Sequence, residues 1–298
     1  MKRYAICAVA LLCATFLPAA GQGEGGEFSF DGIQALEIDA KSFEVEIQGT
    51  SGRRATMTIE NMPDRHTVRH SISGSRVRIW VELETTLFSR PHRGRLVFHV
   101  PRETELTVGT STGAVRISGI SANSLRVDTS TGNIELEDIR SELRARSNTG
   151  TIDVRRSVGR FDIGSVTGSI TLRGIDGDIN ASSSTGRHIY DDVRGDIDAR
   201  STTGRIELND TIGRVWLHTS TGSQSGRAVT LTGNSSFRAS TGSVDIDLTN
   251  SLEELEFDLT SSTGSLQVGR ERSQRRLFLG GTGIAVTGST STGSQRFF

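Results

Sequence analysis

Cysteine, proline, lysine and aromatic residues are all scarce in this sequence. Its 298 residues include two cysteines, four prolines and 5% aromatic residues, against 34 glycines. Both cysteines, Cys7 and Cys13, lie near the N-terminus, and Lys2 and Lys41 are the only lysines. Beyond residue 13 the chain therefore cannot form a disulfide or a thiolate metal site. We expect packing and backbone hydrogen bonds to supply its stability.

Residues 1–21 have the pattern of a secretory signal peptide. Lys2 and Arg3 precede an apolar stretch over residues 5–17, Pro18 ends it, and residues 19–21 are small. The apolar stretch is short for a membrane span, which favours a cleaved signal over an uncleaved anchor. We predict an exported protein, in the periplasm, on the outer surface or outside the cell, that is not an integral membrane protein after cleavage.

The charges of the chain are nearly balanced. Removing Lys2 and Arg3 leaves 34 − 2 = 32 basic residues against 35 acidic ones, a net charge near −3. This balance gives no global attraction for nucleic acid, so we expect no nucleic-acid partner. The basic residues are almost all arginine, which can bind carboxylate, phosphate or sulfate groups with two hydrogen bonds. Genomic base composition is the alternative explanation for the excess of arginine.

A Thr-Gly dipeptide recurs at an almost fixed interval through two-thirds of the chain. The intervals are 19, 18, 18, 18, 18, 18, 20, 22 and 29 residues, and a fixed period of this size is typical of repeat architectures. Because glycine tolerates positive φ, each Thr-Gly pair is predicted to form a tight structural turn at the corner of a coil. The glycines are Gly113, Gly132, Gly150, Gly168, Gly186, Gly204, Gly222, Gly242, Gly264 and Gly293.

Apolar and polar residues alternate between these glycines, which predicts short half-buried strands. In the repeat over residues 132–149, Ile134, Leu136, Leu143 and Ala145 fall on the predicted inner side. No segment has the helical period. Since one coil cannot bury its own apolar face, stacked coils must share a narrow core. The sequence therefore predicts an all-β fold, a single-stranded β-helix or β-solenoid with about 18 residues per coil.

The regularity of the pattern divides the chain. Residues 28–101 alternate without the short period and are predicted to form irregular N-terminal β coils, whereas residues 102–298 form the repetitive solenoid. The register loosens after Gly222. A last coil exposes unpaired strand edges and needs a cap. We interpret the arginine-rich segment 270–276 and the terminal segment 296–298 as parts of an irregular C-terminal cap.

Several segments together carry a family resemblance. They are the signal peptide, the opening strand at 28–30, Val100-Pro101 followed by residues 106–108, and the repeated Thr-Gly-x-Ile/Val-x-Leu/Val coils. Over residues 28–298 the chain resembles the bacterial putative-adhesin family, secreted β-solenoids related to the head regions of auto-transporter-like adhesins. The resemblance implies a right-handed β-helix, export and no catalytic role.

The sequence contains no recognisable catalytic motif, and we expect neither an enzyme nor a cofactor. His66 and His70 are four residues apart, but in a predicted loop and strand they are interpreted as solvated rather than as metal ligands. Paired carboxylates recur at similar places in several coils, which favours a solvated face over a glycan-cleaving or calcium site. These pairs are Asp176/Asp178, Asp191/Asp192, Asp196/Asp198 and Asp245/Asp247.

Two local anomalies have both a structural and a functional interpretation. His188 and Tyr190 occupy predicted inward positions where neighbouring coils carry Ile, Val or Leu. They form either a shallow site or, as we favour, a bulky pair packed together, because buried histidines usually have a partner. The segment Arg194-Gly195-Asp196 matches a tripeptide that some cell-surface receptors bind. We interpret this match as coincidence, because Gly-Asp also recurs at Gly177-Asp178.

Arginine rows are the candidate binding feature. Stacked coils place equivalent side chains about 5 Å apart, so a row of arginines could follow an anionic polysaccharide. Interleaved acidic residues could equally pair with them, and such exposed pairs add little stability. The candidate face consists of Arg144, Arg146, Arg155, Arg194, Arg200 and Arg205.

We therefore expect an exported, non-enzymatic β-solenoid that binds a surface, a polysaccharide or a protein partner through its flat faces. One alternative is a periplasmic scaffold whose coils stack end to end. A polysaccharide-active β-helix enzyme and an ice-binding protein are weaker alternatives.

Overall fold

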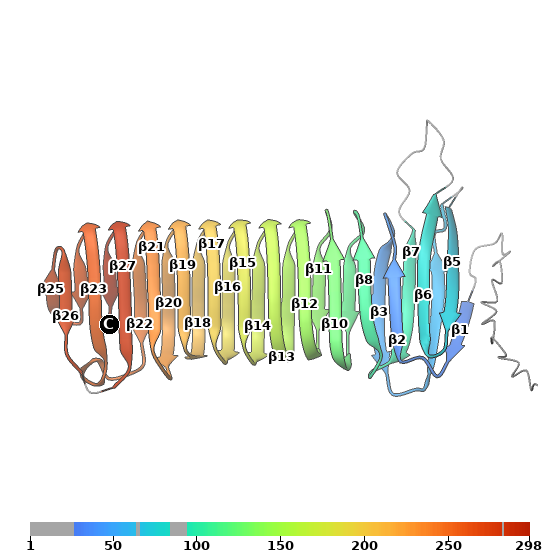
Figure 1. Cartoon of the computed structure of the whole chain (residues 1–298), viewed down its shortest axis with the longest axis horizontal. Helices are drawn as coiled ribbons and strands as arrows, with labels where there is room; N and C mark the ends of the chain where they lie inside the picture. The colour runs from blue at the N-terminus through green and yellow to red at the C-terminus, as the bar shows by residue number, and fades with distance from the viewer. Residues whose placement is uncertain (1–26, 64–65, 84–93, 282) are drawn as a thin grey trace, which may run out of the picture.

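The computed structural model describes residues 27–63, 66–83, 94–281 and 283–298. In this part of the chain, 28 strands stack side by side into one long rod (Figure 1). The 3-10 turn Leu252–Glu254 is the only helical element of those residues, and none of their helices could cross a membrane. The predicted signal peptide, residues 1–21, lies outside the described residues.

Each regular coil contributes one strand to each of two long sides of the rod. Strand β13 (Ile152–Thr167) passes through a corner and belongs to both sides. Neighbouring coils pair in parallel, and Ile152 lies beside Ile170, which is 18 residues further along. Side 1 contains β9 (Val115–Ser118), β11 (Ile134–Glu137), β14 (Ile170–Asp176), β16 (His188–Arg194), β18 (Ile206–Gly213), β20 (Gln224–Leu231) and β22 (Val244–Leu248). Side 2 contains β8 (Glu105–Thr110), β10 (Ser121–Thr129), β12 (Arg140–Thr149), β15 (Ile179–Thr185), β17 (Ile197–Thr203), β19 (Val215–Thr221) and β21 (Ser235–Thr241).

The core is a narrow layer between the two sides, filled by every second residue of each strand. Like residues stack directly on one another, as Leu143, Phe161 and Ile179 do. All three are buried, and so are Ile134 and Leu136 on the opposite side. The all-β solenoid with about 18 residues per coil is confirmed. The inward column beside the Thr-Gly corner is polar and consists of Thr110, Thr129, Ser147, Ser165, Ser183, Ser201 and Thr219.

The N-terminal end is built from strands that are out of sequence order. The coil formed by β2 and β3 lies between the later strands β6 and β7 on one face and β8 and β9 on the other. Antiparallel pairings of β1 with β4, β4 with β7, and β5 with β6 complete this end. The strands are β1 (Glu27–Asp31), β2 (Ala35–Asp39), β3 (Glu44–Thr50), β4 (Arg54–Glu60), β5 (His66–Ser73), β6 (Arg76–Leu83) and β7 (Arg95–Pro101).

The C-terminal end repeats this arrangement. The last coil, β27 and β28, lies between β21 and β22 on one face and β23 and β24 on the other. Strands β25 and β26 close the end by antiparallel pairing, as expected for segment 270–276. Our interpretation of residues 296–298 as part of the cap is wrong, because Phe297 lies inside the stack. The strands are β23 (Glu256–Thr263), β24 (Leu266–Val268), β25 (Glu271–Ser273), β26 (Arg276–Leu279), β27 (Ala285–Thr292) and β28 (Gln295–Phe297).

The Thr-Gly corners bring the backbones of stacked coils into direct contact. At Gly168 φ is +153°, and an added Cβ would lie 1.9 Å from the carbonyl oxygen of Gly150. Gly113 and Gly132 do not have positive φ, so the conformational reason given for them is wrong. At Gly132 an added Cβ would lie 2.2 Å from the carbonyl oxygen of Gly113, and this approach excludes a side chain. The row stacks in the order Phe43, Gly113, Gly132, Gly150, Gly168, Gly186, Gly204, Gly222, Gly242, Gly293, Gly264.

A column of left-handed residues turns the chain before the opposite corner. These residues follow the side 1 strand segment of each coil and recur every 18 positions, and Asp138 and Asp192 have φ of 54° and 50°. Only Gly174 in this column carries a sequence signal for positive φ. The residue after each is buried, as Ile139 and Val193 show. The complete column is Asp138, Arg156, Gly174, Asp192, Asp210 and Ala228.

Candidate functional site

The six candidate arginines do not form one row. Arg144, Arg146 and Arg200 lie on side 2 and Arg155 lies on side 1, whereas Arg194 and Arg205 lie near opposite corners. In the column of Arg146 and Arg200, Gly164 and Ser182 stand between the two arginines. The prediction of one continuous cationic face is therefore wrong in its geometry.

Each of these arginines is also paired with a carboxylate. The guanidinium of Arg146 lies 2.6 Å from Asp162 and that of Arg200 lies 2.7 Å from Asp198. Arg144 also faces Asp162, and Arg155, Arg194 and Arg205 pair with Asp153, Asp192 and Glu207. Exposed pairs of this kind contribute little stability. They do neutralise the outer faces locally, which removes the basis for a polyanion track.

The corner carboxylates have a structural role. Asp178 accepts a hydrogen bond from the backbone N–H of Asp196, and Asp196 accepts one from the backbone N–H of Arg214. The Arg214 guanidinium also donates to Asp196, which lowers the pKa of that carboxyl. Each aspartate thus ties one coil to the next. The carboxylate of the Arg194-Gly195-Asp196 tripeptide is engaged in this way.

His188 and Tyr190 are sealed inside the core. His188 Nδ1 lies 3.1 Å from the Tyr190 hydroxyl, and Nε2 lies 2.7 Å from Ser183 Oγ. Ser183 Oγ donates to Ser201, so it accepts from Nε2–H while Nδ1 accepts from Tyr190. Neither His188 nor Tyr190 has exposed surface. The pair therefore forms a satisfied internal hydrogen-bond chain with no route for a substrate.

Two glutamines share the environment of His188, and the sequence analysis missed them. Gln224 and Gln295 are the second residues after Gly222 and Gly293, fully buried as His188 is. Gln224 donates to Thr219 and Gln295 to Thr290, each five residues earlier, as Ser183 is from His188. The signal was readable, because a polar residue follows Thr-Gly-x in all three coils where Ile, Val or Leu is usual.

We predict that His188 makes the rod less stable at acidic pH. Burial lowers the pKa of His188 to about 4 from 6.5, so the unfolded chain binds a proton that the folded chain refuses. Stability is complete above pH 6.5 and falls between pH 6.5 and 4, by about 3 kcal/mol. His188→Gln should lack this loss, because the equivalent position of a later coil already holds Gln224 in the same surroundings. Urea unfolding of both proteins at pH 7 and pH 4.5 measures the difference, and equal pH dependence would contradict the prediction.

His66 and His70 lie on strand β5 but have different surroundings. The His66 ring centroid lies 5.4 Å from that of Phe43, and the His70 ring lies against Phe28 and Phe30. Among the described residues no group of three or more His, Cys, Asp or Glu side chains could hold a metal ion. The two rings pack at the N-terminal end of the rod.

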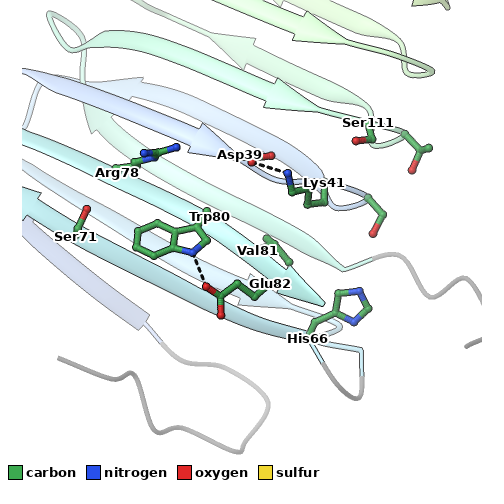
Figure 2. A pocket seen from close by; sticks show the side chains of 11 residues that line it. Asp39, Lys41, His66, Ser71, Arg78, Trp80, Val81, Glu82 and Ser111 are labelled. Carbon is green, nitrogen blue, oxygen red and sulfur yellow. Dashed lines mark hydrogen bonds and ion pairs between the residues drawn. The ribbon is translucent and has the colours of Figure 1, made fainter. Parts of the chain in front are cut away.

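A hollow of about 930 Å³ opens on side 2 near this end (Figure 2). Trp80 lies on β6, which pairs with β5 and β2, and its indole is half-buried on the outer surface. Asp39 lies beside it on β2, and Arg78 and Glu82 flank it two residues away on its own strand. Lys41 follows Asp39 and pairs with it at 2.7 Å.

Hydrogen bonds fix the indole ring of Trp80. Its Nε1–H donates to Glu82 at 2.9 Å, and the guanidinium of Arg69 pairs with the same carboxylate. These two donors lower the pKa of Glu82, which keeps the carboxylate ionised. The hollow therefore combines one held aromatic surface with charged and hydroxyl groups at its rim, including Ser71 and Ser111.

A model of the Toastrack DUF4097 family matches residues 33–283. This chain belongs to the Toastrack family. The matched segment includes the Trp80 hollow and the whole regular solenoid. Membership confirms the resemblance to bacterial adhesin-like solenoids that the repeats indicated.

Three solved structures illustrate what the Toastrack chain is similar to. A putative cell adhesion protein from Clostridium sporogenes is 7% identical, with 92% of this chain and 98% of that one covered and a TM-score of 0.33. A putative adhesin from Bacteroides fragilis is 12% identical, with coverages of 92% and 97% and a TM-score of 0.34. A putative lipid binding protein from Parabacteroides distasonis is 14% identical, with coverages of 93% and 98% and a TM-score of 0.40. The search of curated proteins found no match.

The Toastrack hollow was not predicted from the sequence. Trp80 reads there as one residue of an alternating strand, with nothing to separate it from its neighbours. Its partners Arg69 and Asp39 come from strands that pair out of sequence order. Only the antiparallel β5–β6 pairing and the insertion of β2 bring these side chains together.

Proposed function

We propose that this chain is an exported, non-catalytic β-solenoid that binds a surface, polymer or protein partner through an outer face. The observation that carries the proposal is the hollow at Trp80, which is open on the outer surface of side 2. Such concave sites with a few convergent polar groups are the usual places for ligands. Export is supported by the signal-like sequence of residues 1–21.

The distribution of titratable groups supports binding over chemistry. The strongly shifted pKa of His188 arises from burial in the core, away from any opening. The shifted acidic groups, Glu82, Asp138 and Asp196, each lie in ion pairs with arginine, which favour the ionised form rather than a proton-transferring one. These features suit a rigid rod that presents side chains without reacting.

The rod ends favour binding along the sides over end-to-end stacking. The scaffold alternative requires parallel coils of two molecules to continue one stack. Antiparallel strands close the rod at both ends, with β5 at one end and β25 and β26 at the other. Edge strands in such arrangements oppose further pairing.

Protease treatment of intact and lysed cells tests the proposed location. We expect the exported rod to be degraded on intact cells if it faces outward, and after outer-membrane permeabilisation if it is periplasmic. Immunoblotting against a cytoplasmic control protein measures both. Protection until the cytoplasm itself is opened would contradict export.

A further inference from the structure

The residues around Trp80 form a cross of alternating charge. Arg69 and Asp39 lie beside Trp80 on the two neighbouring strands, and Arg78 and Glu82 lie two residues before and after it. On one strand face these five side chains are nearest neighbours. A cation and an anion thus stand on each axis of the cross, with the indole at the centre.

Every charge of this cross is already paired. Arg69 pairs with Glu82 and Asp39 with Lys41, and Arg78 pairs with Glu37 at 3.3 Å. The local net charge is therefore zero, and a strongly charged ligand would have to break one of these pairs. The pairs still offer free acceptor and donor positions, since a carboxylate has about four lone-pair sites and a guanidinium five N–H groups. A neutral ligand with many hydroxyl groups can use these positions without displacing a charge.

The indole ring supplies the apolar contact. Its N–H is held by Glu82, so the plane of the ring is fixed before a ligand arrives, and little side-chain entropy is lost on binding. Aromatic rings contribute large contact areas with only two rotatable bonds. A pyranose ring has a flat C–H face and a rim of hydroxyls, which matches one fixed aromatic plate surrounded by donors and acceptors.

The second tryptophan of side 2 provides an internal comparison. Trp216 lies on β19, also half-buried and outward, but the guanidinium carbon of Arg214 lies 5.2 Å from the centroid of its ring. That cation–π contact already occupies one face of the indole. Trp216 does not line the hollow. The two tryptophans of the chain thus separate an available ring from an occupied one.

We infer that the Trp80 hollow is a binding site for a neutral saccharide chain, which stacks on the indole and hydrogen-bonds to Asp39, Arg78 and Glu82. This inference rests on the proposed binding function and names its ligand class. The hollow of about 930 Å³ is within the size range of ligand sites, so it accommodates an oligosaccharide rather than a single ion.

Titration of the purified full-length mature chain with neutral hexasaccharides tests the inference. The probes are the hexamers of β-1,4-glucose, α-1,4-glucose, β-1,3-glucose and N-acetylglucosamine, followed by calorimetry and tryptophan fluorescence. We expect at least one to bind, Trp80→Ala to weaken it tenfold or more, and Trp80→Phe to retain part of the affinity. Trp216→Ala is the matched control and should change the affinity less than twofold. Unchanged melting temperatures show that the variants are folded.

Three results would overturn the inference. The first is binding that Trp80→Ala leaves intact. The second is binding of polygalacturonate or heparin in place of the neutral hexamers, lost at high salt, which would identify a polyanion ligand. The third is no binding of any hexamer by a chain that is still retained on isolated cell envelopes. In that case the saccharide site fails while the proposed function stands, whereas loss of both removes the proposed function as well.

Discussion

Replacing Phe297 by alanine is expected to destabilise the rod by about 3–5 kcal/mol. Phe297 is fully buried, and its ring centroid lies 5.4 Å from that of Phe237 and 5.5 Å from that of Phe257. The three rings belong to three adjacent coils, and the chain's second-last residue occupies the middle one. Truncation removes the ring contacts on both faces and leaves a cavity between two coils.

Phe298→Ala is the matched control for this substitution. The Phe298 side chain is 51% exposed, so its removal should change the unfolding free energy by less than about 0.5 kcal/mol. Urea unfolding measures both variants. A double-mutant cycle of Phe297→Ala with Phe257→Ala should show coupling of about 0.5–1.5 kcal/mol, since the rings touch. Equal effects at 297 and 298 would contradict the insertion of the last coil.

Alanine at Gly168 is expected to destabilise the rod by about 3 kcal/mol or more. The new Cβ would meet the carbonyl oxygen of Gly150 at 1.9 Å, and φ at this position is +153°. Backbone atoms on both sides are held by the strand ladders, so neither can withdraw easily. The steric clash therefore adds to the conformational strain that positive φ imposes on alanine.

Two further glycines separate these two causes. Gly74 has φ of +60° but nothing within 4 Å of an added Cβ, so Gly74→Ala tests strain alone, at about 1–2 kcal/mol. Gly132 lacks positive φ but would meet the carbonyl oxygen of Gly113, so Gly132→Ala tests the clash alone, at about 1–3 kcal/mol. Urea unfolding should rank Gly168→Ala as the most costly. A neutral Gly132→Ala would show that close stacking does not select these glycines.

Much of the solenoid could be predicted from the sequence because its coils repeat one local pattern. The spacing of Thr-Gly and the alternation around Ile134 and Leu143 determine which residues point inward, and each coil reads the same way. Both ends were harder, since their pairings are not local. Nothing near Phe297 in the sequence indicates that its neighbours are Phe237 and Phe257.

The candidate site shows the same limit. Arg146 and Arg200 could be assigned to an outer face from their parity, but their pairing with Asp162 and Asp198 depends on cross-strand and diagonal geometry. Trp80 and Asp39 are 41 positions apart in the chain and become neighbours because β2 inserts beside β6. Period and parity predict a side chain's face, and they do not predict which distant strand lies next to it.

Retention of the purified rod on isolated cell envelopes, with soluble carbohydrate measured in the same samples, tests the proposed function most directly. We predict saturable retention, competed by the saccharide that binds at Trp80, with no release of fragments over time. Release that grows with time and is abolished by Asp191→Asn would show an enzyme instead. No retention on any envelope fraction would contradict a binding role altogether.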